Sequence, residues 1–250
     1  ARDIPKPYLY GLRFDFKPHP NIEIGLEKTA LLGGRKGRPE DARTWIDSLL
    51  PFSDTENRLG DPGDQRAGID IKWTIPSNLQ PVQLYLEAAG EDEYHNLPNL
   101  WAFVGGIYFP GIVGMERLDF RVEYATTRGR KNSPNIWYVH HIYTSGYTYK
   151  GDIIGHHIGT DADDLFIELS WLMPENNSKV FLFYDHEEHN LYVPGFHEFK
   201  TELGLGVRGD FPQKITGSFR YSQGWIVNPG NADLPTIKEK QLEAAMIYSF

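Results

Sequence analysis

The chain has 250 residues, a net charge of −9 at neutral pH and no cysteine. The acidic balance argues against a nucleic-acid partner, because phosphate-binding surfaces need an excess of Lys and Arg. The lack of cysteine excludes disulfides, zinc–thiolate sites and thiol nucleophiles. No run of about 18 apolar residues occurs, so no transmembrane helix is expected. Aromatic residues make up 14 % of the chain, an amount that aromatic girdles at two membrane interfaces would use.

The first part of the chain alternates apolar and polar residues as a β-strand with two different faces does. Segment 8–16 has Tyr, Leu or Phe at every even position, and segment 22–26 repeats the alternation after the Pro-containing residues 17–20, which predicts a hairpin. Residues 29–65 then lose the alternation. Within them, Asp41 to Leu50 is expected to form a short helix.

Further strands are predicted wherever the alternation returns. A second long irregular region covers 126–164, although 136–143 inside it has the composition of an extended segment. Loops of this length are usually functional or mobile. The remaining predicted strands are 69–75, 82–88, 100–109, 118–124, 165–171, 180–184, 199–207 and 215–221.

The last ten residues show the alternation most strictly. One face carries only apolar side chains, and the other is polar except for Ala245 and Ile247. A chain that ends on Phe, with an aromatic residue two positions earlier, resembles the closing strand of bacterial outer-membrane β-barrels, which the barrel-insertion machinery reads. An amphipathic strand that ends a soluble β-sandwich is the alternative. The apolar face consists of Leu242, Ala244, Met246, Tyr248 and Phe250.

The number and length of the strands favour a membrane barrel over a sandwich. About eleven or twelve strands are visible, each near the roughly ten residues that a tilted membrane crossing needs. Their apolar faces carry large side chains, and short turns alternate with long loops. We therefore predict one all-β domain over residues 1–250, a transmembrane antiparallel β-barrel in the bacterial outer membrane, with membrane lipid against its apolar face.

Counting backward from a periplasmic Phe250 predicts the side on which each loop lies. The scheme needs an odd number of strands, whereas single-chain bacterial barrels have even numbers. We therefore expect the chain to be the C-terminal part of a larger barrel. A native protein with an intact mass of 28.6 kDa would contradict this. The loops predicted on the outer side are 29–65, 91–99, 126–164, 186–198 and 222–238.

Several stretches of the chain resemble the Wzi family of outer-membrane capsule-assembly proteins. The resemblance implies a barrel of eighteen strands that attaches or organises exported capsular polysaccharide at the cell surface. The periplasmic helical bundle of that family has no counterpart in this sequence. The similar stretches are Gly11–Phe14, Gly25–Thr29, Gly33–Pro39, Arg121–Thr127, His140–Tyr147 and Gly155–Gly159.

Side chains of the predicted outer loops form a plausible glycan surface as a set. Aromatic rings stack on the apolar face of a sugar, while His, Arg and carboxylates bond its hydroxyls. For each residue alone, anchoring at the membrane interface or packing inside a loop is the alternative role. The candidates are Arg43, Trp45, Tyr147, Tyr149, His156, His157, Asp161, Glu187, Tyr192 and Trp225.

No catalytic or metal site is predicted. His186–Glu187–Glu188–His189 lacks the HExxH spacing, and Asp161, Asp163 and Asp164 lack the spacing of a known calcium loop. Ser145 and Ser170 have no supporting motif for a nucleophile. We therefore expect a protein without enzymatic activity or cofactor. A general or cation-preferring porin with an acidic lumen is the alternative function.

Overall fold

The computed structural model describes most of the chain. Within the described part, no helix is long and apolar enough to cross a membrane. The described residues are 4–35, 40–49, 63–94, 97–128, 137–191, 197–211, 215–231 and 233–248.

Strands dominate the structure. Among the described residues, three single 3-10 turns and one short helix, α1, accompany them. In chain order the elements are β1 (Tyr8–His19), β2 (Ile22–Leu32), α1 (Ala42–Leu49), β3 (Gly63–Ile75), β4 (Val82–Tyr94), β5 (Leu97–Phe109), η1 (Ile112–Gly114), β6 (Leu118–Thr126), β7 (Thr148–Tyr149), β8 (Asp152–Ile153), β9 (Ala162–Met173), η2 (Pro174–Asn176), β10 (Ser178–His189), β11 (Glu198–Phe211), β12 (Ile215–Val227), η3 (Pro229–Asn231) and β13 (Ile237–Tyr248).

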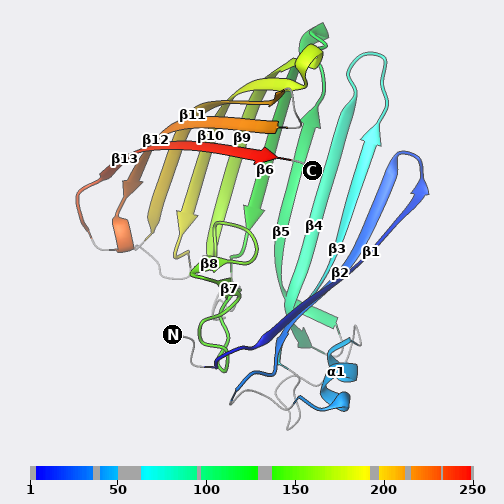
Figure 1. Cartoon of the computed structure of the whole chain (residues 1–250), viewed down its shortest axis with the longest axis vertical. Helices are drawn as coiled ribbons and strands as arrows, with labels where there is room; N and C mark the ends of the chain where they lie inside the picture. The colour runs from blue at the N-terminus through cyan, green and yellow to red at the C-terminus, as the bar shows by residue number, and fades with distance from the viewer. Residues whose placement is uncertain are drawn as a thin grey trace. The chain divides into compact units, whose positions relative to one another are not determined.

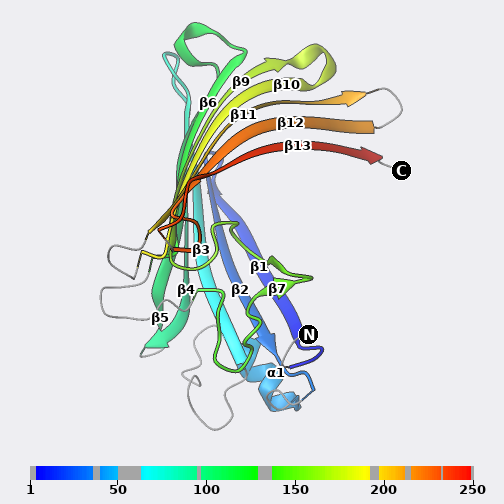
Figure 2. The ribbon, with the colours of Figure 1, turned by 90° about the vertical axis from the view of Figure 1, so that its left-hand side faces the viewer.

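Eleven of the described strands form one sheet in which each strand pairs with its neighbours along the chain, from β1 to β6 and then from β9 to β13. The pairs β1–β2, β10–β11, β11–β12 and β12–β13 are antiparallel. Figures 1 and 2 show β9 to β13 side by side in this order. The short strands β7 and β8 form a separate antiparallel pair. This arrangement confirms the prediction of a large antiparallel sheet.

The chain divides into two compact units, which are described separately. Several strands contribute one part to each unit. The first unit comprises 1–72, 86–104 and 126–162, and the second comprises 73–85, 105–125 and 163–250.

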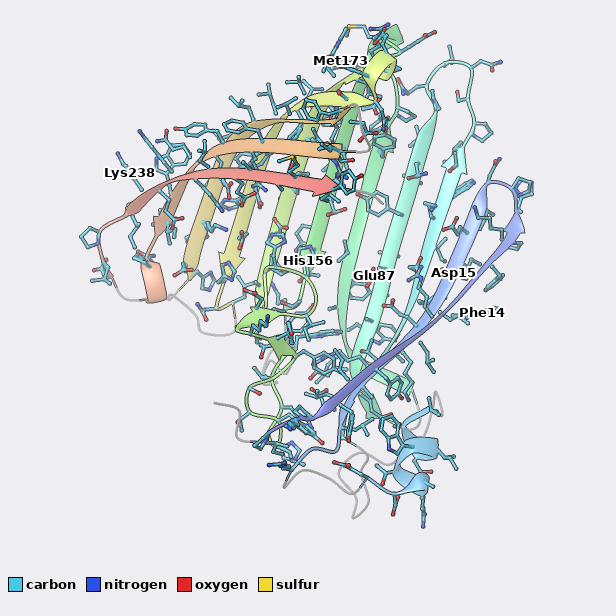
Figure 3. The ribbon with its side chains drawn as sticks, in the orientation of Figure 1. Phe14, Asp15, Glu87, His156, Met173 and Lys238 are labelled. Atoms are coloured by element: carbon cyan, nitrogen blue, oxygen red, sulfur yellow. The ribbon has the colours of Figure 1, made fainter. Side chains whose placement is uncertain are left out.

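In the first unit, β1 has one apolar and one charged face. Phe14 and Asp15 leave the strand on opposite sides (Figure 3). On the charged face, Arg13 forms ion pairs with Asp70 at 2.8 Å and Glu27 at 3.2 Å. On the opposite face Phe14 is 63 % exposed. The hydrocarbon core of a membrane would cover such an apolar face.

The second unit has the same two faces. Arg220 pairs with Glu202 at 2.8 Å on the charged face, while Leu182, Leu203 and Leu242 on the other face are 56, 49 and 67 % exposed. In a soluble sandwich this apolar face would be buried against a second sheet. The predicted alternation of faces, including the apolar row of the terminal strand, is thus present.

Two phenylalanine rings lie over glycines on the charged face of the second unit. Phe183 is opposite Gly204 and Phe181 is opposite Gly206 in the β10–β11 register. A Cβ atom at either glycine would overlap the facing ring. Because glycine has no side chain, each ring can lie along the sheet, and the Arg220 guanidinium stands 4.0 Å from the centre of the Phe183 ring.

The structure corrects several predicted loop boundaries. Strand β4 ends at Tyr94 and strand β5 begins at Leu97, so most of the predicted outer loop 91–99 belongs to strands. His186 to His189 belong to β10 and Trp225 belongs to β12, although both were predicted in outer loops. Polar side chains on both faces hide the alternation there, whereas backbone pairing continues, with Glu187 opposite Lys200.

The extended segment expected at 136–143 is also wrong for the part that the structure describes. Residues 137–143 form turns and bends, and the strands of this region are β7 and β8. The predicted helix is confirmed as α1.

Candidate functional site

Residues 137–161, which we name the 137–161 loop, pack against the sheet of the first unit. Tyr143 and Tyr147 of the loop form a buried cluster with Ile4 and Leu31. The Tyr143 hydroxyl donates to the carbonyl of Gly33 at 3.1 Å, and the Tyr147 hydroxyl donates to the carbonyl of Asp64 at 3.0 Å. The loop is therefore fastened to backbone groups of β3 and of the segment after β2.

A sharp turn gives the loop its shape. Gly146 has φ 60°, and a Cβ atom there would collide with the carbonyl of Tyr138. This left-handed position favours glycine. It brings the backbone N–H of Tyr147 to the same carbonyl at 3.3 Å. The β7–β8 hairpin follows, with Tyr149 opposite Asp152.

Arg66 of β3 is the centre of the attachment. Its guanidinium lies 3.5 Å from the centre of the Tyr147 ring, 5.4 Å from that of Tyr138 and 5.5 Å from that of Trp137. It also pairs with Glu91 at 3.1 Å and with Asp64 at 3.5 Å. The buried guanidinium is attracted to both carboxylates and to the faces of the three rings, and these contacts hold the five side chains in fixed positions relative to one another. We name these six residues the Arg66 cage.

Burial keeps the phenols of the cage neutral. It raises the pKa of Tyr147 and of Tyr138 above the ordinary value. A neutral phenol donates a hydrogen bond, as Tyr147 does to Asp64, while its ring faces the guanidinium. The hydroxyl of Tyr138 accepts a bond from the backbone N–H of His156 at 2.9 Å, which ties the second half of the loop to the first.

The two histidine pairs of the loop are built differently. His140 and His141 have ring centres 4.5 Å apart, as have His156 and His157. His140 accepts from the backbone N–H of Ile142 at 3.1 Å and is thus part of the loop scaffold. His141 and His157 are exposed. Figure 3 shows His156 on the loop, and this side chain is half-buried.

The loop therefore has an inner and an outer side. Of the predicted glycan residues, Tyr147 is inner and buried, and so is Asp161. Tyr149 is 63 % exposed, and Lys150 lies 5.3 Å from its ring centre. Tyr149, His141 and His157 are the aromatic side chains that the loop presents to solvent among those described.

Helix α1 lies on the other face of β1. Asp41 caps it by accepting from the backbone N–H of Thr44 at 2.8 Å. The Trp45 ring packs edge-on against Tyr8 with ring centres 5.7 Å apart, and Tyr8 belongs to the apolar row of β1. Arg43 is exposed and lies 3.5 Å from Asp47. Figures 1 and 2 show α1 near the start of β1. Trp45 is thus packed on the apolar face.

Other predicted residues lie in the second unit. Glu187 is buried, accepts from Lys200 at 2.7 Å and lies 2.9 Å from His189. Trp225 stands in β12 opposite Thr201. Tyr192 and Phe250 lie outside the described residues, and Tyr248 ends β13.

The sequence profile of the family described as "Capsule assembly protein Wzi" matches residues 1–234. The chain belongs to this family. The predicted resemblance is therefore confirmed. The stretches His140–Tyr147 and Gly155–Gly159, which carry part of it, are the two arms of the 137–161 loop.

Two relatives support the assignment. A protein of Klebsiella pneumoniae, described as "Uncharacterized 55.8 kDa protein in cps region", is 33 % identical over 126 residues, which is 50 % of this chain and 25 % of that protein. The solved structure of Wzi of Escherichia coli has a TM-score of 0.68 at 24 % identity. It is described as an outer-membrane protein involved in group 1 capsule assembly and as a carbohydrate-binding β-barrel. The match covers 97 % of this chain and 51 % of that one.

The sequence reasoning missed most of the Arg66 cage. Arg66 directly follows the irregular region 29–65 and has no neighbour that marks it as special. Trp137 and Tyr138 lie in segment 136–143, whose composition predicts an extended segment. One signal was present, because Tyr143 and Tyr147 lie inside a stretch that resembles the Wzi family. Their burial shows that these family-like residues hold the loop in place.

Proposed function

We propose that this chain is part of an outer-membrane β-barrel that binds exported capsular polysaccharide through the exposed side of the 137–161 loop. The observation that carries the proposal is the Arg66 cage, which holds a loop with exposed Tyr149, His141 and His157 in one conformation. A prearranged surface binds better than a mobile one, because less conformational entropy is lost on binding.

The chemistry of the exposed side suits a sugar chain. The ring of Tyr149 offers an apolar face for stacking, and Lys150 and Asp152 beside it supply a donor and an acceptor for hydroxyls. His141 and His157 can each donate or accept, depending on the protonation of the ring. The remaining predicted residues, Arg43, Trp45, Asp161, Glu187, Tyr192 and Trp225, stay candidates for secondary contacts.

The apolar face supports the membrane location. Its exposed Leu, Phe and Met side chains match what lipid chains contact in a barrel, and the terminal aromatic pattern around Tyr248 and Phe250 suits recognition by the barrel-insertion machinery. Because the chain spans about half of the Escherichia coli protein, these partners and the polysaccharide are proposed for the whole protein that contains this chain.

Binding is favoured over catalysis and conduction. The hydroxyl of Ser170 donates to Glu168 at 2.7 Å, and Glu168 also accepts from Lys179 at 2.7 Å, so this serine belongs to an ion-pair network. The 137–161 loop packs on the charged face of the first unit, the face that a porin would line with water.

The test measures binding of the detergent-folded protein to capsular polysaccharide from its own source. Tyr149→Ala is expected to weaken binding about fivefold to tenfold, in line with the roughly 1 kcal/mol of a good aromatic contact. Tyr149→Phe, which keeps the ring, is the matched control. The same binding measurement on Trp45→Ala and Trp225→Ala tests the two tryptophans that lie outside the 137–161 loop, in α1 and β12.

The opposite result is equally informative. If the polysaccharide does not bind and the protein shows steady single-channel conductance in a planar bilayer, the porin function replaces this proposal.

A further inference from the structure

The charged face of the second unit contains a pocket that none of the glycan-binding candidates lines. Its volume is about 350 Å³, and strands β4, β5, β6, β9 and β10 contribute side chains to it. The side chains that matter for its chemistry are Tyr85, Tyr108, Arg121, Glu123, Glu168 and Lys179.

A tyrosine ring forms part of the wall of this pocket. A Cβ atom at Gly106 would overlap the Tyr85 ring and would lie 2.8 Å from the carbonyl of Val122, so the ring occupies the space above that glycine. From there the Tyr85 hydroxyl donates to Glu123 at 2.6 Å. The side chain thus runs along the sheet from β4 across β5 to β6, and it lines the pocket.

The carboxylates of the pocket all have partners within the protein. Asp119 accepts from the Tyr108 hydroxyl and from the backbone N–H of Gly111 at 3.0 Å. Glu168 accepts from Lys179 at 2.7 Å. Each of these oxygens retains lone pairs for a further donor.

Arg121 differs from these groups. Its guanidinium lies 4.8 Å from the centre of the Phe166 ring. Its Nε atom is buried, and no hydrogen-bond acceptor among the described residues contacts it. Arg121 lines the pocket, so the N–H groups of its guanidinium that face the pocket can donate to an oxygen of a ligand.

We propose that this pocket binds one uncharged pyranose ring of the polysaccharide, stacked on Tyr85 and hydrogen-bonded to Arg121. The inference rests on the proposed function, since it names a second position for the same class of ligand. Sugar hydroxyls accept from the guanidinium and donate to the carboxylates. An uncharged ring fits better than an anion, because three carboxylates and two cations already line the pocket.

The test is saturation-transfer NMR and titration of the detergent-folded protein with glucose, galactose and mannose, and with glucuronate as the anionic comparison. Arg121→Met keeps the contact with Phe166 and removes the donors. It is expected to weaken hexose binding at least fivefold, whereas Arg121→Lys restores part of it. Arg117→Met, which removes an exposed pair with Glu175, is the matched control.

The outcomes separate this site from the loop. Arg121→Met should weaken hexose binding by the same factor in a Tyr149→Ala background, where the stacking ring of the loop is absent. Equal hexose binding by Arg121→Met and the unchanged protein, binding of none of the hexoses, or tighter binding of glucuronate would each overturn the assignment. Loss of hexose binding in Tyr149→Ala would place the sugar on the loop instead.

Discussion

Replacement of Arg66 by Met should release the 137–161 loop while the sheet stays folded. The side chain of Arg66 is 7 % exposed, and those of Asp64 and Glu91 are 1 % and 5 % exposed. Removing one partner of a buried ion pair typically costs about 3–5 kcal/mol, because the remaining charge stays desolvated. Arg66, Asp64 and Glu91 belong to strands of the large sheet, whereas the 137–161 loop does not pair with that sheet by a strand ladder. The loop is therefore expected to open first.

Amide hydrogen exchange read by mass spectrometry measures this opening. A loss of about 3 kcal/mol in the free energy of local opening corresponds to exchange faster by roughly two orders of magnitude in residues 137–161. Amides of β11 and β12 should exchange as before. Arg13→Met is the control, since Arg13 also carries three carboxylate contacts but is 44 % exposed.

Neutral replacements of Asp64 and Glu91 test whether their desolvated charges cause the faster exchange. If the desolvated charges are responsible, Arg66→Met combined with Asp64→Asn and Glu91→Gln should recover much of the protection. Unchanged exchange of the loop in Arg66→Met would refute the reasoning, because the Arg66 cage would then contribute nothing to holding the loop.

Three further changes test the faces, the close approaches and the helix cap. Spin labels attached at Leu242→Cys and Glu243→Cys in liposomes should differ in their collisions with two relaxation reagents. Oxygen, which dissolves in lipid, should collide more with the label at position 242, and a water-soluble nickel reagent should collide more with the label at position 243. Equal accessibility of the two labels would contradict a membrane-facing row. Gly204→Ala should lower the free energy of unfolding by about 1–3 kcal/mol because its Cβ meets the Phe183 ring and, at 2.8 Å, the carbonyl of Tyr221, whereas Gly224→Ala, with its nearest atom at 3.7 Å, should be nearly neutral in thermal unfolding. The backbone N–H of Thr44 lowers the pKa of Asp41. The contribution of this cap to stability is therefore complete above the ordinary carboxyl pKa of about 3.9 and is lost as the pH falls through the lower pKa of the folded protein. A change of Trp45 fluorescence in this acid range should disappear in Asp41→Asn, which caps without titrating, and a change that persists in this variant would exclude Asp41 as the cause.

The strand segments with one apolar, membrane-facing side were predictable from the sequence. The strand ends, where both faces are polar, were not. Alternation is visible where an apolar row faces a charged row, as at Leu242 and Glu243. It vanishes at 186–189, where both faces of β10 are polar, although the backbone ladder continues to His189. Hydropathy therefore reports the surroundings of a strand, and the strand ends lie where those surroundings change.

The candidate site was predicted in composition but not in arrangement. The sequence pointed to the aromatic and histidine residues of the 137–161 loop, and the structure divides them into buried supports such as Tyr147 and exposed residues such as Tyr149. That division depends on Arg66, which is more than 70 positions away from these tyrosines along the chain. No local pattern contains such a contact.

The rings that lie over Gly106, Gly204 and Gly206 also determine how much room the charged face leaves. A Phe or Tyr side chain that projected from the sheet would occupy space above the charged face, whereas a ring that lies over a glycine stays close to the backbone. The glycines thus act as spacers that let the rings of Tyr85, Phe181 and Phe183 lie flat along the sheet. A substitution that lifts one of these rings from its glycine would reduce the free space above this face of the sheet.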